Sequence, residues 1–500
     1  MIIRRCWPAR TVGEHMSMTL QELVEGWALT DSQVRISGVC LDNRSIQQGE
    51  LFVAVQGQVG HGLDYAQAAV EAGAVAVIHD GLGTLPALDV PVVRVAGLGD
   101  KLGELASRYY GAPSEQMTIA GVTGTNGKTT VAHFLAQSWQ RVYGNAGMVG
   151  TIGYGPTGHL QGGERTTPDA LHLQHILADC LNAGVERLAM EVSSHALQQN
   201  RCQTVQFDAA IYTNLSRDHL DYHADMAEYA AAKRRLFTDY APAFAIINHD
   251  DAYGRKWFGE LNGGMQMLSF GLQEGAELRA EVRSMNIEGM TIRISGPWGS
   301  EEFHTSLLGE FNASNLLAAA GTLALLGMPW HRVLHQLELM QPVPGRMMRL
   351  GGEQGQPVVV IDYAHTPDAL EHALQAVRAH LDGRLSCVFG CGGNRDQGKR
   401  PQMGRAAELL ADDVFVTSDN PRFESASKII EDVVAGLESP DRVTVEPDRA
   451  AAIRKAIANS QPGDVVLVAG KGHETWQEIG GEKVPFSDES TILTALGDAA

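Results

Sequence analysis

The stretch GVTGTNGKTT, residues 121–130, decides the fold of the chain around it. The segment MTIA immediately precedes it, and Val131, Phe134 and Leu135 keep helical spacing after it. A strand, a glycine-rich loop and a helix in this order are typical of a P-loop within a parallel α/β sheet. The plainer alternative is a glycine-rich turn that binds no ligand.

The loop carries the residues that a phosphate site needs. Gly127, Lys128 and Thr129 occupy their places in the pattern G-x-x-x-x-G-K-[ST], whereas Val122 stands where the first glycine is usual. Backbone N–H groups near the glycines and the helix N-terminus favour bound phosphate, and the Thr129 hydroxyl can bind Mg²⁺. The residues expected to bind ATP here are Gly124, Thr125, Asn126, Gly127, Lys128, Thr129 and Thr130.

The bulk composition restricts the class of protein. A chain of 500 residues predicts several domains, and a net charge of -20 argues against a general nucleic-acid or anionic-membrane surface. The six cysteines form no CxxC pair, which favours reduced thiols and a cytoplasmic location. We expect no transmembrane helix and no signal peptide, and residues 1–15 are interpreted as an extension.

Three sections of α/β pattern follow one another: residues 1–110, 111–343 and 344–500. The first has short apolar strands near 51–55, 75–79 and 90–95, with a helix over 65–73. In the second, strands near 187–192, 209–215 and 244–248 alternate with helical stretches, which indicates a mostly parallel sheet. The Pro- and Gly-containing joint near 342–350 separates the last section, and a hinge is predicted at 341–346.

The third section repeats an apolar strand followed by a polar loop. The four loops begin DYAHTPDAL, CGGNRDQGKRP, SDNPR and GKGHE. In open parallel sheets ligands bind beyond the carboxyl ends of the strands, so these loops should open on one edge.

Two strand ends in the second section carry metal-binding residue types. Glu191 ends one strand, and Asp218 and His219 follow another. Beside a P-loop these groups suit a metal site, although each histidine alone could be structural. The Ala-rich pattern EYAAAKRRLF by itself indicates that Lys233 is a solvated helix lysine.

The motifs TGTNGKTT, EVSSH, TNLSRDHLDYH with the later AAAK, GEFNASN, GRM, DYAHTPD and GKGHE together resemble the Mur ligase family, from about residue 41 to 474. The resemblance implies ATP-dependent amide formation in peptidoglycan precursor synthesis, through an acyl phosphate. It also implies three domains: a small N-terminal α/β domain for the UDP end, a central P-loop ATPase domain and a C-terminal Rossmann-like domain that brings the amino acid. The partners implied are ATP, a UDP-N-acetylmuramoyl dipeptide and meso-diaminopimelate, with the protein as a monomer.

The resemblance also implies roles for individual residues. Lys233 would be carbamylated and would bind Mg²⁺ together with Glu191 and His219, with a second Mg²⁺ near Thr129. Lys128, Lys233 and His219 would be catalytic. Further ATP contacts would come from Asn312, Asn315, Arg346, Asp362 and His365.

The nucleotide-sugar end is expected to be held by residues of the first two sections. The family commonly has Asp-Ser-Arg where this chain has Asp42-Asn43-Arg44, and Asn43 keeps the capacity to hydrogen-bond. The segment LDNRS alone is equally typical of a turn. The residues implied are Leu41, Asn43, Gln58, Thr166, Thr167, Ser193, Gln199 and Arg201.

The loop SDNPR is expected to read the far end of meso-diaminopimelate, which carries a second carboxylate and a second ammonium group. Arg422 suits a bidentate carboxylate contact, while Asp419 could hold the loop or face an ammonium group. The plainer alternative is a surface Asn-Pro turn. The set implied for this substrate is Arg395, Asp419, Asn420, Pro421, Arg422, Gly470 and Glu474.

Three other functions are alternatives to this one. A folylpolyglutamate synthase would add glutamate and need no reader of a distal zwitterion. A transport-type P-loop ATPase would need neither DYAHTPD nor GKGHE. A non-catalytic nucleotide-binding regulator would be expected to lack Lys128 or the metal ligands, which are present here.

Overall fold

The computed structural model describes residues 18–57, 60–163, 165–219, 222–261, 264–353 and 355–498. Gln58 and the expected extension at residues 1–15 lie outside these ranges. The chain forms two compact units, which are described separately: one comprises the chain up to Glu277 with Ala318–Pro329, and the other comprises Leu278–Leu317 with the chain from Trp330.

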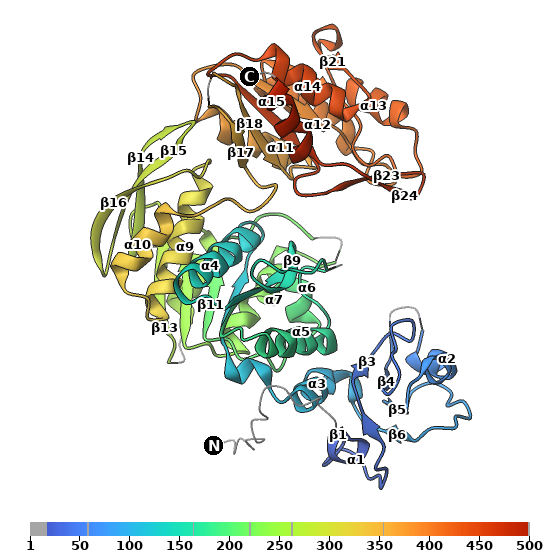
Figure 1. Cartoon of the computed structure of the whole chain (residues 1–500). Coiled ribbons are helices and arrows are strands. Elements are labelled where there is room, and N and C mark those ends of the chain that lie inside the picture. The colour runs from blue at the N-terminus through green and yellow to red at the C-terminus, as the bar shows by residue number, and fades with distance from the viewer. Residues whose placement is uncertain are drawn as a thin grey trace. The chain divides into compact units, whose positions relative to one another are not determined.

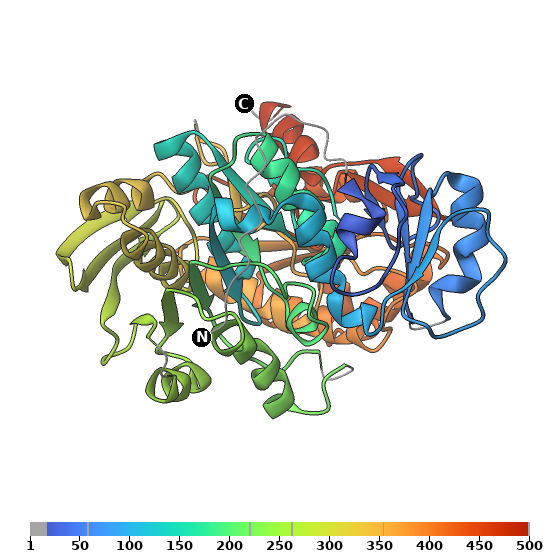
Figure 2. The same cartoon turned by 90° about the horizontal axis from the view of Figure 1, so that it is seen from below.

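A parallel sheet of four strands forms the N-terminal part of the first unit. Its order is β3 (Val39–Cys40), β4 (Leu51–Ala54), β5 (Ala76–His79) and β6 (Val92–Arg94). Alternate side chains of β4 and β5 enter two different apolar clusters, so both faces of the sheet are covered. Figures 1 and 2 show α2 (Ala66–Ala72) beside these strands, and the predicted strands and helix are confirmed. The other elements here are β1 (Met18–Thr19), α1 (Leu20–Leu23), β2 (Arg35–Ile36) and α3 (Leu102–Tyr110).

The central sheet of the first unit is parallel except at one edge. Its strand order is β13-β12-β11-β7-β10-β8-β9, and β9 alone in this run pairs antiparallel. The strands are β7 (Thr118–Thr123), β8 (Ala146–Gly150), β9 (Gly153–Pro156), β10 (Arg187–Glu191), β11 (Ala209–Tyr212), β12 (Phe244–Asn248) and β13 (Gln266–Gly271). The helices are α4 (Lys128–Tyr143), α5 (Ala170–Asn182), α6 (Ser194–Gln198), α7 (Met226–Thr238) and α8 (Ala252–Glu260).

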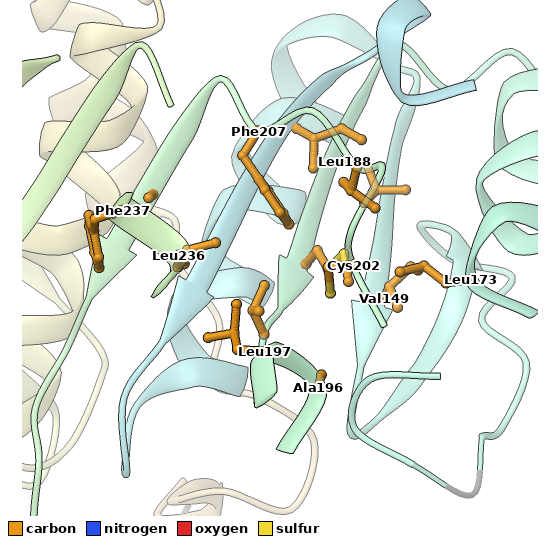
Figure 3. Close-up of a cluster of buried hydrophobic side chains, with 14 of the residues drawn as sticks. Val149, Leu173, Leu188, Ala196, Leu197, Cys202, Phe207, Leu236 and Phe237 are labelled. Atoms are coloured by element: carbon orange, nitrogen blue, oxygen red, sulfur yellow. The ribbon is translucent and has the colours of Figure 1, made fainter. Parts of the chain in front are cut away.

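A continuous apolar cluster fixes α5, α6, α7 and α8 on the sheet. Figure 3 shows Phe207, Leu188 and Leu197 projecting from three different segments toward the same interior. Because both neighbours of β7 are parallel strands with buried side chains, the end of β7 is held rigidly. The P-loop therefore begins from a fixed point.

The second unit contains an antiparallel sheet that the sequence interpretation missed. β14 (Leu278–Asn286) pairs with β15 (Gly289–Gly296), which pairs with β16 (Gly299–Thr305). Helix α10 (Trp330–Glu338) contacts β16, and α9 (Phe311–Leu325) contributes residues to both units.

The C-terminal sheet of the second unit has the order β17-β18-β22-β19-β20-β21. β17 (Met348–Gly351) is antiparallel, whereas β18 (Val358–Asp362), β22 (Val465–Ala469), β19 (Leu385–Phe389), β20 (Asp413–Val416) and β21 (Thr444–Val445) run parallel. Its helices are α11 (Pro367–Arg378), α12 (Lys399–Leu410), α13 (Ala426–Val434), α14 (Arg449–Asn459) and α15 (Asp488–Asp498). A hairpin of β23 (Trp476–Ile479) and β24 (Glu482–Pro485) follows β22.

The predicted meeting of four loops at one sheet edge is confirmed. β18, β22, β19 and β20 are parallel neighbours, so the loops that follow them leave the same edge. Among the described residues, no helix has the length and apolar character needed to cross a bilayer.

Candidate active site

The P-loop joins β7 to α4 through two glycines with positive φ. Gly124 has φ +151°, and a Cβ there would lie 1.9 Å from Thr213 Oγ1. Gly127 has φ +83° and immediately precedes α4. Glycine is therefore required at Gly124 by space as well as by conformation.

Lys128 folds back over this loop. Its Nζ donates to Gly124 O at 3.0 Å and to Thr125 O at 2.8 Å. Asn214 braces the other side, because its backbone O and its Oδ1 accept from the N–H groups of Thr125 and Asn126. An ammonium group and a helix N-terminus thus converge on one short loop, as an anion site requires.

Glu191, at the end of β10, lies directly against the start of α4. Its Oε2 accepts from the Thr129 hydroxyl at 2.9 Å, and its Oε1 accepts from the Thr151 N–H at 2.7 Å. Burial raises the pKa of the Glu191 carboxyl, while the charge of Lys128 and these hydrogen bonds act against that rise. The prediction that Glu191 lies beside the P-loop is therefore confirmed.

Lys233 is buried in α7, so its interpretation as a solvated helix lysine is wrong. Its side chain is 1% exposed, and Nζ donates to Gly124 O at 2.7 Å. Nζ also lies 4.5 Å from the centre of the Tyr229 ring. Burial, followed by the charge of Lys128, holds the pKa of Lys233 well below its usual value.

A pocket of about 290 Å³ brings together many of the predicted residues. His219, whose ring lies 5.0 Å from that of His195, is on its wall together with Lys128 and Lys233. The remaining lining residues are Arg165, Thr166, Thr167, Ser193, Ser194, His195 and Arg201. Within the described part of the chain, no three His, Cys, Asp or Glu side chains form a metal-binding group by themselves.

Thr167 links the predicted nucleotide-sugar residues to the strand end. Its hydroxyl donates to Glu191 O at 2.8 Å and accepts from the Ser193 N–H at 3.1 Å. Arg201 donates to Thr167 O at 2.8 Å and to Gln199 Oε1 at 2.6 Å. Burial, followed by the charge of Arg165, lowers the pKa of Arg201. An oriented guanidinium group of this kind suits an anionic substrate.

The segment LDNRS in the N-terminal sheet forms a turn. The Ser45 N–H donates to Asp42 O at 3.0 Å, and Arg44 forms an ion pair with the Asp42 carboxylate at 2.6 Å. Leu41 packs against the apolar cluster of this sheet, and Asn43 is partly exposed on the turn.

The other predicted ATP-binding residues lie in the second unit, in two groups. Asn315 donates to Asn312 Oδ1 at 3.0 Å, and both are buried at the start of α9. Arg346 lies 4.8 Å from the Tyr363 ring. Burial raises the pKa of Asp362, whereas the charge of Arg346 opposes that rise. His365, two residues beyond Tyr363, bonds through Nδ1 to Tyr363 O.

Two of the four strand-end loops are joined at Asn420. Its Nδ2 donates to Glu474 Oε2 at 2.8 Å, which ties the loop after β20 to the loop after β22. Asp419, whose side chain is 8% exposed, lies 3.8 Å from Lys471. A Cβ on Gly470 would lie 2.7 Å from Asp419 Oδ2, so glycine permits this approach.

Arg422 is held at the same edge with a positive φ of +53°. Its Nε meets Glu478 Oε2 at 3.1 Å, and its Nη1 donates to Gly393 O at 2.7 Å. Pro421 precedes it in the buried part of the loop, whereas Arg395 in the loop after β19 is exposed. Arg422 is thus fixed by groups from two other segments.

Sequence reasoning missed three groups at these sites: His195, Lys471 and Glu478. Their motifs or neighbourhoods were noticed, but their contacts join segments distant along the chain. The signal available for Lys471 was its place between two glycines after an apolar strand. Glu478 lies in a hairpin that no expected element included.

Comparisons with known proteins agree with this geometry. Residues 35–110 match the family description "Mur ligase family, catalytic domain", residues 122–323 "Mur ligase middle domain", and residues 345–472 "Mur ligase, glutamate ligase domain".

Full-length relatives are similar over almost the whole chain. The chain is 46% identical to the UDP-N-acetylmuramoyl-L-alanyl-D-glutamate–2,6-diaminopimelate ligase of Alkalilimnicola ehrlichii, covering 96% of this chain and 99% of the relative. It is 44% identical to the ligase of the same description from Xanthomonas campestris pv. campestris, covering 96% and 97%. A solved structure of a protein so described has a TM-score of 0.72 at 33% identity, covering 97% of this chain and 99% of that one.

Proposed function

The chain belongs to the Mur ligase family, and on that premise we propose that it joins meso-2,6-diaminopimelate to UDP-N-acetylmuramoyl-L-alanyl-D-glutamate with cleavage of ATP. It is an ATP-dependent ligase of peptidoglycan precursor synthesis. One observation supports this choice of amine: the side chains of Asn420, Glu474 and Arg422 are held by hydrogen bonds at one sheet edge. The Glu474 carboxylate suits an ammonium group of the substrate, and the Arg422 guanidinium suits a carboxylate.

The reaction forms an acyl phosphate and then an amide. A carboxylate oxygen of the nucleotide-sugar dipeptide attacks the γ-phosphorus of ATP, and ADP leaves. The neutral amine then attacks the acyl carbon, and phosphate leaves as the amide forms. Lys128 offsets the repulsion between the two anions of the first step. Arg201 and the threonines beside it hold the dipeptide in the pocket that Lys128 lines.

Mg²⁺ is the cofactor that this reaction class uses, and the residues present fit it. The Glu191 carboxylate and the Thr129 hydroxyl, 2.9 Å apart, supply the oxygen ligands that Mg²⁺ prefers. His219 lines the same pocket. When bound, the metal would stabilise charge on the phosphate oxygens. We propose Thr129, Glu191, His219 and carbamylated Lys233 as the residues that hold it.

Carbamylation of Lys233 is supported by its environment. The neutral amine adds to the carbon of CO₂ and loses a proton, so a low pKa favours the reaction. Burial and the nearby charge of Lys128 supply that low pKa. Two-dimensional NMR of protein equilibrated with ¹³C-bicarbonate should show one carbamate carbon that is lost in Lys233→Ala. A spectrum without that signal in the wild-type protein would exclude the carbamate.

The remaining assignments belong to the same proposal. We propose domains at 1–110, 111–343 and 344–500, with boundaries near the ends of the matched family segments. We propose that Asn312, Asn315, Arg346, Asp362 and His365 complete the ATP site, and that the enzyme acts as a monomer in the cytoplasm.

The deciding experiment is phosphate release with a panel of amines. The purified chain receives ATP, Mg²⁺ and the UDP-muramoyl dipeptide, with meso-diaminopimelate, L-lysine or L-glutamate as the acceptor. We expect phosphate release and a product of the matching mass chiefly with meso-diaminopimelate. Equal turnover with L-lysine would refute the proposed specificity, and turnover only with L-glutamate would indicate a different ligase.

A further inference from the structure

Lys471, between the two glycines of GKGHE, is completely buried among the loops at the edge of the C-terminal sheet. Its Nζ donates to Asn420 Oδ1 at 3.1 Å and to Glu474 Oε2 at 2.9 Å. Asn420 and Glu474 follow two different strands, β20 and β22. One ammonium group therefore ties together two of the loops assigned to the amine acceptor.

These bonds fix the orientation of the Asn420 amide. Its Oδ1 accepts from Lys471 and from the Glu478 N–H at 3.0 Å, so its Nδ2 must point the other way. Nδ2 then donates to Glu474 Oε2 at 2.8 Å. Without Lys471, one of the two donors that hold the amide oxygen would be lost.

The same bonds select one oxygen of the Glu474 carboxylate. Within the described residues, both side-chain donors to Glu474, from Asn420 and Lys471, meet Oε2. This leaves Oε1 as the oxygen available to a substrate, and the side chain is 18% exposed. A carboxylate anchored through one oxygen presents the other in a defined direction, which an ammonium group can use.

The charges around Lys471 also favour an added cation. Asp419 lies 3.8 Å from Lys471, and the buried pair Arg449–Asp488 is close enough to influence the pKa of Asp419. When all five groups, including Glu474, are ionised, three carboxylates face two cations. Burial raises the pKa of Asp419, and an ammonium group bound at Glu474 would help to keep Asp419 ionised.

We infer that Lys471 is a positioning residue that orients Asn420 and Glu474 toward the distal ammonium group of the amine acceptor. The inference rests on the proposed function. It separates two tasks at this edge: Arg422 recognises the distal carboxylate, while Lys471, which no substrate atom needs to touch, sets the geometry of the groups that bind the ammonium.

The test is a set of variants measured in the ligase reaction. Lys471→Met should raise the KM for meso-diaminopimelate about 10- to 100-fold, as expected for a charge-assisted hydrogen bond, with the KM for ATP unchanged within about twofold. Lys483→Met is the matched control. Both lysines lie near the Trp476 ring, Lys483 at 4.3 Å and Lys471 at 5.6 Å from its centre. They differ in burial, because Lys483 is exposed. Lys483→Met should leave both KM values unchanged.

A double-mutant cycle separates positioning from general damage. If Lys471 acts through Glu474, Lys471→Met should add little to the loss caused by Glu474→Gln. Fully additive losses, or an unchanged acceptor KM in Lys471→Met, would overturn the inference. If Lys471→Met does not fold, Lys471→Gln, which removes the charge and shortens the side chain, is measured instead, and an acceptor KM equal to that of the wild type would overturn the inference. Wild-type protein inactive with every amine would refute the proposed function instead.

Discussion

Thr129 donates its hydroxyl hydrogen to Glu191 Oε2 at 2.9 Å, which joins the first turn of α4 to the end of β10. Glu191 is 0% exposed, so water cannot solvate its carboxylate. Its charge must be stabilised by hydroxyl donors, by the Thr151 N–H or by a cation. This contact places an oxygen ligand pair beside the P-loop.

Glu191→Gln should impair the use of Mg²⁺. The substitution keeps the shape and removes the charge, so we expect phosphate release to fall about 100- to 1,000-fold and the Mg²⁺ concentration for half-maximal rate to rise. Thr129→Ser, which retains the hydroxyl, is the control and should lose far less. A Glu191→Gln enzyme with the Mg²⁺ dependence of the wild type would show that this carboxylate has no part in metal use.

Gly124→Ala should abolish nucleotide binding. The new Cβ would lie 1.9 Å from Thr213 Oγ1, so the loop must move. Gly144→Ala is the matched control: Gly144 also has a positive φ, +82°, but nothing lies within 4 Å of its Cβ position. It should cost only about 1 kcal/mol of stability. Calorimetric titration with a non-hydrolysable ATP analogue separates the two, and equal affinity in both variants would contradict the expectation.

Arg422→Ala should change the choice of amine acceptor. Loss of the guanidinium should raise the KM for meso-diaminopimelate about 10- to 100-fold. The KM for L-lysine should change little, because lysine has no distal carboxylate. Arg384→Ala is the control. Arg384 pairs with Asp413 where β19 and β20 begin, whereas Arg422 lies in the loop beyond the other end of β20. A rise confined to the KM for ATP would exclude Arg422 as the reader of the carboxylate.

The sequence predicted the elements whose defining residues are close together along the chain. The apolar runs that became β18, β19, β20 and β22 could be read because buried parallel strands are continuously apolar. The P-loop could be read because its glycines, lysine and threonine are adjacent. The antiparallel strands β14–β16 were missed, although turn residues such as Glu288-Gly289 and Trp298-Gly299 separate them.

The site could be predicted less completely, because its contacts join distant segments. Lys233 is buried because it shares a helix face with Tyr229 and Phe237, four residues to either side. That spacing was present in the sequence, but the neighbouring alanines made the shared helix face hard to recognise. No pattern along the chain indicates that Arg422 meets Glu478, since that pair depends on the fold of the hairpin.

His133 should make stability depend on pH. Burial lowers the pKa of this histidine from 6.5 to about 4. The unfolded chain therefore binds a proton at His133 near pH 6.5, while the folded protein does so only near pH 4. Its stabilising contribution is complete above pH 6.5 and is lost as the pH falls, by about 3 kcal/mol at most. Urea unfolding at pH 7.5 and 5 should show a smaller loss in His133→Phe than in the wild type. Equal losses would show that this histidine is not held neutral.

Breaking the buried pair Arg449–Asp488 should be among the costliest single changes in the second unit. The guanidinium meets both carboxylate oxygens, at 2.7 Å each, and both side chains are 0% exposed. Asp488→Asn leaves a buried charge uncompensated, so we expect a loss of about 3–5 kcal/mol in the free energy of unfolding. The double change Arg449→Met with Asp488→Leu should recover most of that loss, because no charge remains buried. Asp413→Asn, which breaks the exposed pair with Arg384, should cost far less. If urea unfolding gives equal losses for Asp488→Asn and Asp413→Asn, the buried pair does not contribute as its burial requires.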